Sequence, residues 1–227
     1  MQHTHNCIYC HHALYLLNDG MVKCSQCKKK YSPARVHQIL RVMDCFCNEE
    51  NALAASKNLA LSYATVLKYY QAFRHLAAKH CEEQYHLHRS EESQYEEYLY
   101  LEKSKRPNKK AIFDSHNFLT FSYGEHVYTI LMPSLGVYKQ QFLEDNLEDV
   151  YAKEFSKFMR SSKIIKISEH DNAITRFWYY FENFIMTFKG VSDEHFPYYL
   201  KEAEFKFNTP IQVRSKILER LYFRAEL

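Results

Sequence analysis

Glycine and proline are scarce in this chain, which has four glycines and five prolines among 227 residues. Long flexible linkers are rich in such residues, so their scarcity argues against small domains on loose tethers. No low-complexity tract or internal repeat is present, which excludes repeat architectures. The 19 tyrosines and 16 phenylalanines predict well-filled cores or stacking surfaces and exclude a disordered chain.

Long apolar runs are also missing. No stretch approaches the roughly 20 apolar residues of a membrane-spanning helix, and the N-terminus lacks the hydrophobic region of a signal peptide. We therefore expect a cytoplasmic protein with no membrane partner, in which cysteines stay reduced and are free to hold metal. The length suits one ordinary domain with one or two small ones.

Charge is distributed unevenly along the chain. The net charge is +3. Residues 1–89 carry eleven Lys and Arg against six Asp and Glu, whereas the remainder is slightly acidic. A basic N-terminal third is expected of a part that contacts phosphates. A solvated basic surface is the alternative, and charge alone does not separate the two.

Two Cys-x-x-Cys pairs, thirteen residues apart, lie close to the N-terminus. Two such knuckles can give Zn²⁺ a closed tetrahedral shell of sulfur ligands. A turn at residues 18–20 (Asn-Asp-Gly) predicts a hairpin between them, as in a zinc ribbon. Free or disulfide-bonded thiols are the alternative, and His11 and His12 are interpreted as surface residues. The predicted ligands are Cys7, Cys10, Cys24 and Cys27.

Helical periodicity follows the ribbon. It predicts helices at residues 34–46, 50–59 and 63–78, with Ser62 as the N-cap of the third. A short helix, a tight turn and a second helix form a helix-turn-helix pattern, for which an ordinary three-helix core is the alternative. The side chains predicted to contact bases or phosphates are Lys57, Ser62, Tyr63, Thr65, Lys68, Tyr69 and Arg74.

The chain changes character after a polar boundary at residues 80–92. Strands are predicted at residues 95–101, 111–121, 126–132 and 163–168, with a helix at 147–159 before the last strand. This order matches the start of a ribonuclease H-like fold. Helices are predicted at 174–188, 197–207 and 210–227. The expected class is α+β and multidomain, with a zinc ribbon (1–32), a helix-turn-helix bundle (33–80) and a reduced ribonuclease H-like α/β domain with C-terminal helices (93–227).

This order of parts resembles the zinc-ribbon insertion-sequence transposases of bacteria. Two stretches near the C-terminus strengthen the likeness to that family's His-x-Asn-x-Ile-Glu-x-Phe-Trp and Gly-Val … Tyr-Leu-x-Glu-x-x-Phe-x-x-Asn signatures. They are His170-x-Asn172-x-Ile174-x-x-Phe177-Trp178 and Gly190-Val191 with Tyr199-Leu200-Lys201-Glu202 and Phe205-x-Phe207-Asn208. The resemblance covers nearly the whole chain.

The resemblance implies three acidic residues that hold two Mg²⁺ ions for cleavage and joining of DNA strands. The candidates are Glu97 on the first strand and Glu169 or Asp171 after the fourth. Threonine 175 stands where the third acid is expected, and glutamate replaces the expected aspartate at the first position. A second possible triad is Asp114, on a predicted strand, with Asp171 and Glu182.

These departures indicate an impaired catalytic core. The leading hypothesis is a transposase-like DNA-binding protein that uses its ribbon and helix-turn-helix, with structural Zn²⁺. The alternatives are an active Mg²⁺-dependent strand transferase and a zinc-ribbon module for protein interaction or transcriptional regulation. DNA is the expected partner and a small-molecule substrate is not. A homodimer is expected because two protomers would pair two transposon ends.

Overall fold

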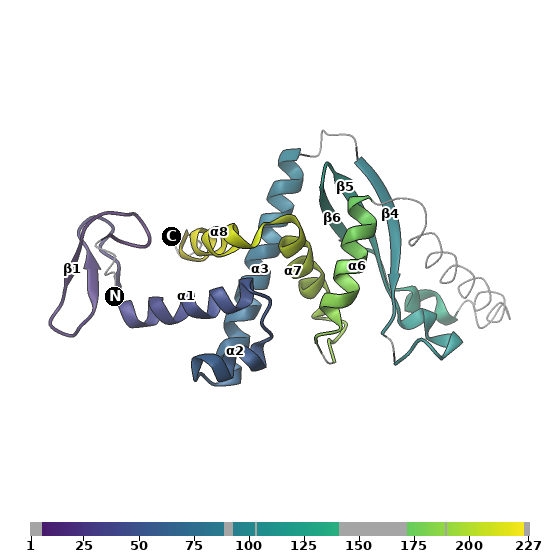
Figure 1. Ribbon diagram of the computed structural model, residues 1–227, viewed down its shortest axis with the longest axis horizontal. Coiled ribbons are helices and arrows are strands. Elements are labelled where there is room, and N and C mark those ends of the chain that lie inside the picture. The colour runs from purple at the N-terminus through teal and green to yellow at the C-terminus, as the bar shows by residue number, and fades with distance from the viewer. Residues whose placement is uncertain (1–5, 89–92, 103, 141–171, 189, 225–227) are drawn as a thin grey trace. The chain divides into compact units, whose positions relative to one another are not determined.

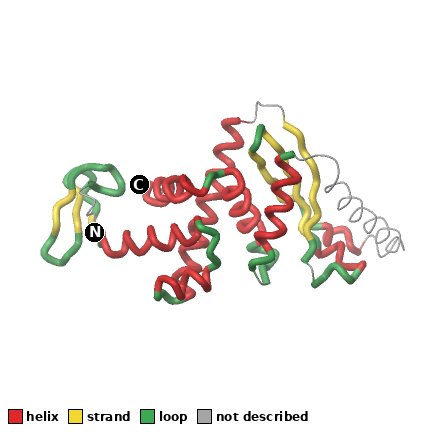
Figure 2. The backbone as a smooth tube through the Cα atoms, viewed as in Figure 1, coloured by secondary structure: helices red, strands yellow, loops and turns green. Residues whose placement is uncertain are grey.

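The computed structural model describes residues 6–88, 93–102, 104–140, 172–188 and 190–224 (Figure 1). The chain divides into two compact units, Met1–His80 with Thr209–Leu227, and Cys81–Asn208. Figure 2 shows the two classes of structure that build them, helices and short antiparallel sheets. Among the described residues, no helix is both long and apolar enough to cross a membrane.

The first unit begins with a three-stranded antiparallel sheet. Strands β1 (Leu14–Leu16), β2 (Val22–Cys24) and β3 (Lys30–Tyr31) pair in sequence order. Gly20, with a φ of 75°, makes the turn between β1 and β2. The hairpin predicted between the two cysteine pairs is therefore confirmed.

Three helices follow the small sheet. Helix α1 (Pro33–Cys47) starts at the N-cap Ser32, and α2 (Ala52–Leu59) starts at the N-cap Asn51. Ala60 adopts a left-handed conformation that ends α2, and α3 (Tyr63–His88) begins after a three-residue turn. The predicted helices are present, but α3 runs ten residues further than expected. The stretch predicted as a polar boundary is helical because Cys81 and Tyr85, one turn apart, provide an apolar face: Cys81 is buried and Tyr85 stacks on Tyr128 at 4.0 Å.

The last helix, α8 (Ile211–Arg224), packs against α1 in the first unit. Arg214 donates from its guanidinium to the Cys47 carbonyl oxygen at 3.0 Å and pairs with Glu49 at 3.0 Å. Residues 209–227 were predicted to belong to the C-terminal domain. The structure groups them with the N-terminal unit, because the buried Arg214 binds Cys47 and Glu49 of that unit. The sequence does not reveal that this arginine is buried.

A second antiparallel sheet forms the centre of the other unit. Strands β4 (Ser93–Tyr100), β5 (His116–Tyr123) and β6 (His126–Leu131) pair in the order β4-β5-β6. The register places Tyr98 opposite Phe118 and Thr120 opposite Thr129. A short 3-10 helix, η1 (Lys109–Asp114), lies between β4 and β5 in sequence, and a second, η2 (Leu135–Tyr138), follows β6. Residues 111–114 were predicted as the start of a strand. That was wrong, because the chain coils there before β5 begins.

Helices α6 (Ala173–Ile185) and α7 (Phe196–Asn208) complete the second unit. Helix α6 lies against the sheet (Figure 1). The aromatic stripe of α6 packs on the sheet: Trp178 stacks on Tyr98, with ring centroids 4.8 Å apart, and donates to the Thr120 hydroxyl at 2.9 Å. This stripe was predicted to be core, and its burial confirms that. The helix predicted at 147–159 and the strand at 163–168 lie outside the described residues. The coarse α+β class is confirmed, whereas the ribonuclease H-like topology stays a prediction.

Candidate metal centre and nucleic-acid surface

The four predicted cysteine ligands come together at one point. Their sulfur atoms all lie within 4.8 Å of one another, with Cys7 and Cys27 at 3.7 Å and Cys10 and Cys24 at 3.4 Å. A tetrahedron of sulfurs with Zn–S bonds of 2.3 Å has edges of about 3.8 Å. The cluster is therefore compatible with a structural Zn²⁺ ion. All four thiols are free of disulfides, so the alternative of disulfide pairing is not what the structure has.

Backbone conformation gives the two knuckles matching shapes. The residue after each second cysteine, His11 and Lys28, has a positive φ of 60° and 62°. This left-handed residue closes the turn, and in the first knuckle the His11 amide donates to the Cys7 carbonyl at 2.8 Å. In the second, the Gln26 amide donates to the Cys24 sulfur at 3.3 Å, as amides do to metal-bound thiolates. These contacts hold the sulfurs in place from the backbone.

The three lysines that follow the last cysteine contact the ribbon itself. Lys28 donates to the Ser25 carbonyl at 2.6 Å, Lys29 lies 4.2 Å from the Tyr9 ring centroid, and Lys30 pairs with Asp19 at 2.6 Å. Their charge remains at the surface, but each side chain is oriented by the module. The module therefore positions all three lysine side chains through its own residues.

The candidate DNA-contacting residues divide into exposed and engaged groups. Lys57, Tyr63 and Lys68 are exposed, with Tyr63 at 50%. Ser62 caps α3, since its hydroxyl accepts from the Thr65 amide at 3.2 Å, and the two hydroxyls are 2.7 Å apart. The exposed side chains of Lys57, Tyr63 and Lys68 can contact a ligand, whereas the Ser62 and Thr65 hydroxyls already form a hydrogen bond with each other.

Two further candidates lie on or near the packed side of α3. Tyr69 is half-buried and stacks on Phe73 at 6.3 Å. Arg74 is 3% exposed, with its guanidinium 5.9 Å from the Tyr70 ring centroid. Six residues separate Arg74 from Lys68, which puts them on different faces of a helix with 3.6 residues per turn. Arg74 was predicted to contact phosphate; its burial removes it from the surface that Lys68 presents.

The acidic candidates do not form a cluster in the described part of the chain. Glu97 is exposed on β4, and Glu169 and Asp171 lie outside the described residues. Asp114 ends the 3-10 helix η1, so its placement on a strand was wrong. Within the described residues, the four cysteines are the only group of three or more Cys, His, Asp or Glu side chains close enough to hold a metal.

Glu182, a member of the second possible triad, is occupied by other groups. The Tyr98 hydroxyl donates to its carboxylate, and Arg106 pairs with the same oxygen at 3.5 Å. Burial, reinforced by the Glu182 charge, raises the pKa of Tyr98, so that the hydroxyl stays protonated and donates. Because side chains alternate along a strand, Glu97 points to the face of β4 opposite Tyr98 and hence away from Glu182.

Thr175, where the resemblance leads one to expect glutamate, has a structural role. It occupies the third position of α6 in a capping box with Asn172: the Thr175 amide donates to the Asn172 side chain at 2.8 Å, and the Asn172 amide donates to the Thr175 hydroxyl at 3.2 Å. Both partners satisfy amides that would otherwise lack an acceptor at the helix start. Threonine here stabilises the helix, and it brings no charge for a metal.

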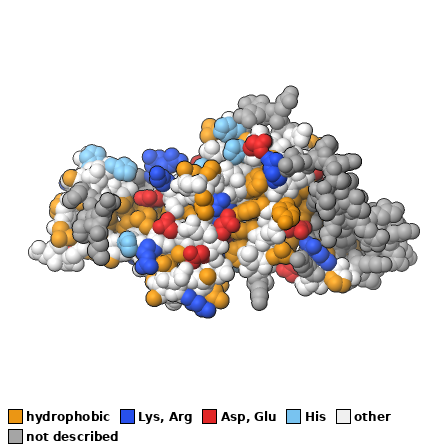
Figure 3. Space-filling model, viewed as in Figure 1, with side chains coloured by type: hydrophobic (Ala, Val, Ile, Leu, Met, Phe, Trp, Pro, Cys, Tyr) orange, Lys and Arg blue, Asp and Glu red, His pale blue; other side chains and the backbone are white. Residues whose placement is uncertain are grey.

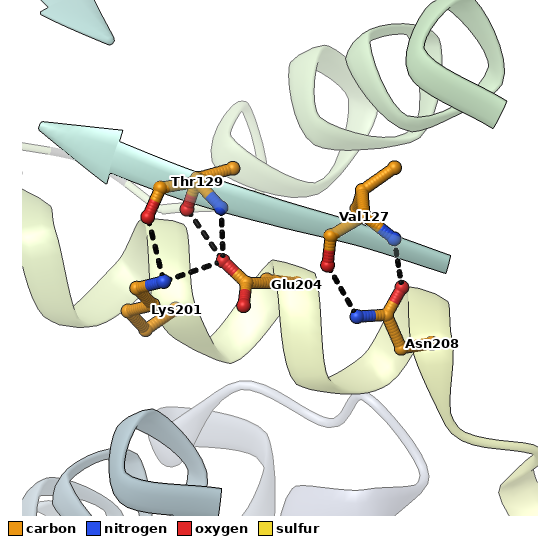
Figure 4. Close-up of polar contacts among 5 residues, drawn as sticks. All are labelled: Val127, Thr129, Lys201, Glu204 and Asn208. Atoms are coloured by element: carbon orange, nitrogen blue, oxygen red, sulfur yellow. Dashed lines mark hydrogen bonds and ion pairs between the residues drawn. The ribbon is translucent and has the colours of Figure 1, made fainter. Parts of the chain in front are cut away.

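Polar side chains of α7 form hydrogen bonds with the backbone along the outer edge of β6, contacts that the sequence did not predict (Figure 4). Asn208 accepts from the Val127 amide at 2.9 Å and donates to the Val127 carbonyl at 2.6 Å. Two residues along, the buried Glu204 accepts from the Thr129 amide at 2.9 Å, while Lys201 donates to the Thr129 carbonyl at 2.7 Å. The helix thus supplies the hydrogen bonds that a neighbouring strand would make, and it protects an edge prone to pairing.

Asn208→Ala tests this edge cover. The substitution removes the two hydrogen bonds to the backbone of Val127, which is buried from water. We expect the free energy of unfolding to fall by about 1–3 kcal/mol. Denaturant unfolding measures the change. Asn183→Ala is the matched control, because its amide donates to the Tyr179 carbonyl on an exposed surface and its loss should cost far less. Equal effects of the two substitutions would contradict the assignment.

Comparison with known proteins gives one informative match. A protein of Haemophilus influenzae named "Uncharacterized transposase-like protein" is 34% identical over 92 residues, which make up 39% of this chain and 73% of that protein. No protein-family model and no solved structure matches the chain.

Proposed function

Because this chain belongs to the family of transposase-like proteins, we propose that it is an insertion-sequence protein that binds DNA with its N-terminal unit. The zinc ribbon and the α2–turn–α3 pair serve as the binding elements. Two copies of the chain pair two DNA ends. The catalytic step of strand cleavage is impaired.

The observation that carries the DNA-binding proposal is the start of α3. A tight turn sets this helix after α2, and its first turns present Tyr63 and Lys68 in exposed positions, with Lys57 exposed on α2. In helix-turn-helix proteins the N-terminal residues of the second helix reach base edges, and nearby cations contact phosphates. Lysine and tyrosine are side chains suited to both roles.

The geometry of the acidic residues supports impaired catalysis. Two-metal cleavage requires carboxylates that converge on one point. The Glu97 side chain lies on one face of β4, whereas Glu182 of α6 contacts Tyr98 on the other face. Arg106 already forms an ion pair with Glu182. Thr175 supports its helix instead of a metal. We therefore assign the second unit a scaffolding role.

The paired variant Lys57→Ala/Lys68→Ala tests DNA binding. We expect it to weaken binding to duplex DNA about tenfold or more and to lower the slope of log K against log salt by about 2, at 0.9 per lost phosphate contact. Fluorescence anisotropy with a labelled duplex measures both quantities. Lys105→Ala/Lys139→Ala removes two cations from the second unit and should leave both unchanged. A wild-type affinity in the Lys57/Lys68 variant would contradict the proposal.

Impaired catalysis has a separate test. The wild-type protein, incubated with Mg²⁺ or Mn²⁺ and a duplex carrying a terminal repeat, is expected to leave both strands intact while still binding. Nicking that disappears in Glu97→Gln would restore the active-transferase alternative. Nicking that persists in Glu97→Gln would point to carboxylates elsewhere in the chain.

A further inference from the structure

Helix α8 presents a row of cations to solvent. Lys216, Arg220 and Arg224 are exposed and recur every four residues, whereas Leu218 and Arg214 are buried. With 3.6 residues per turn, Leu218 and Arg214 lie on the side of the helix away from these three cations, whereas the buried Phe223 lies beside them. The one acidic residue among the described residues of α8, Glu219, is half-buried. We call Lys216, Arg220 and Arg224 the α8 row.

The three side chains of the α8 row lack the hydrogen bonds and the ion pair that hold Arg214 among the described residues. Arg214 donates to the Thr209 and Cys47 carbonyls and pairs with Glu49. In the part of the chain that the structure describes, no hydrogen bond or ion pair fixes the three side chains of the α8 row. One arginine of α8 thus docks the helix, and the other cations are left for an external anion. Lys and Arg side chains (blue) lie over the region of α8 in Figure 3.

The helix that carries the row is held firmly to the rest of its unit. Near its start, the Ser215 hydroxyl donates to Asp44 of α1 at 2.8 Å. Near its end, Phe223 packs edge-on against Tyr9 of the ribbon, with ring centroids 5.9 Å apart. The row therefore spans about 12 Å, at 1.5 Å per residue, from the C-terminal end of α1 toward the ribbon.

We propose that the α8 row binds the phosphate backbone of duplex DNA and adds to the contacts made by the ribbon and the α2–turn–α3 pair. The inference rests on the proposed DNA-binding function. Cations spaced about 6 Å apart along a helix suit a regular polyanion, and the backbone of this docked helix needs no ordering on binding. An amphipathic helix that binds a membrane needs a free apolar face along its length, whereas Leu218 and Phe223 of α8 are buried.

The test compares two triple variants of the full-length, zinc-loaded chain by anisotropy over a range of salt. Lys216→Ala/Arg220→Ala/Arg224→Ala should lower the slope of log K against log salt by up to about 2.7 and weaken binding at least tenfold on duplexes of any sequence. Lys216→Arg/Arg220→Lys/Arg224→Lys keeps the charges and should retain the wild-type slope. Thermal unfolding should be the same for both.

The outcomes separate this inference from the proposed function. A wild-type slope in the alanine variant, with weakened binding in Lys57→Ala/Lys68→Ala, would overturn the α8 assignment alone. Absence of DNA binding by the wild-type chain would remove both. Equal loss in the two triple variants would show a structural role and overturn the inference. The inference would also be overturned if the alanine triple variant kept wild-type DNA binding but no longer bound vesicles of anionic lipid.

Discussion

Cys24→Ser is expected to release Zn²⁺ and unfold the ribbon. Cys24 is fully buried and pairs with Leu14 across the hairpin, so its sulfur links the metal cluster directly to the small sheet. Zinc contributes about 10–16 kcal/mol to the folding of small modules of this kind at pH 7. Serine offers a weak, neutral oxygen in place of a thiolate, and the remaining three sulfurs leave the shell open.

Zinc content by elemental analysis and protection of residues 6–31 from proteolysis measure the effect. Cys45→Ser is the matched control: Cys45 is also buried, but it lies in α1 and outside the cluster, so this variant should keep one zinc per chain. Full zinc retention by Cys24→Ser, with unchanged protection, would contradict a four-cysteine site. Loss of zinc in both variants would indicate general unfolding.

Lys206→Met is expected to lower the free energy of unfolding by about 3–5 kcal/mol. Lys206 and Glu202 form an ion pair at 2.5 Å on α7, with side chains 1% and 2% exposed. Removal of the ammonium group takes a positive charge away from the buried Glu202 carboxylate, which costs far more than the loss of an exposed ion pair would. Chemical denaturation followed by far-UV circular dichroism measures the difference.

A double variant shows whether the cost comes from the buried charge of Glu202. Glu202→Leu/Lys206→Met removes both charges, and it should recover most of the stability that Lys206→Met loses, because an apolar pair needs no desolvated partner. Lys216→Met, on the exposed face of α8, controls for the loss of a lysine and should change stability by less than about 0.5 kcal/mol. A double variant as unstable as Lys206→Met would contradict this account.

Local patterns in the sequence predicted most of the elements. The cysteine spacing and the Asn-Asp-Gly turn identified the ribbon, because metal ligation and turn chemistry depend on neighbouring residues. Helical periodicity located α1, α2, α6 and α7 to within a few residues. The same periodicity would have shown Arg74 to lie one turn from Tyr70, on the packed face.

Long-range partners could not be predicted. Whether Arg214 is a surface cation or a buried anchor depends on Cys47 and Glu49, more than 160 residues away in sequence. Likewise, Glu204 and Asn208 look like ordinary polar residues of a surface helix until β6 is placed beside them. The motif Tyr199-Leu200-Lys201-Glu202, taken as a family signature, contains residues that stabilise the fold: Lys201 donates to the Thr129 carbonyl, and Glu202 pairs with Lys206.

The salt dependence of DNA binding tests the central claim most directly. The zinc-loaded chain, titrated against a labelled duplex between about 50 and 200 mM salt, is expected to show log K falling linearly with log salt, with a slope that reflects several phosphate contacts. Affinity that does not change with salt, or absence of binding at the lowest salt, would contradict a DNA-binding role for the N-terminal unit.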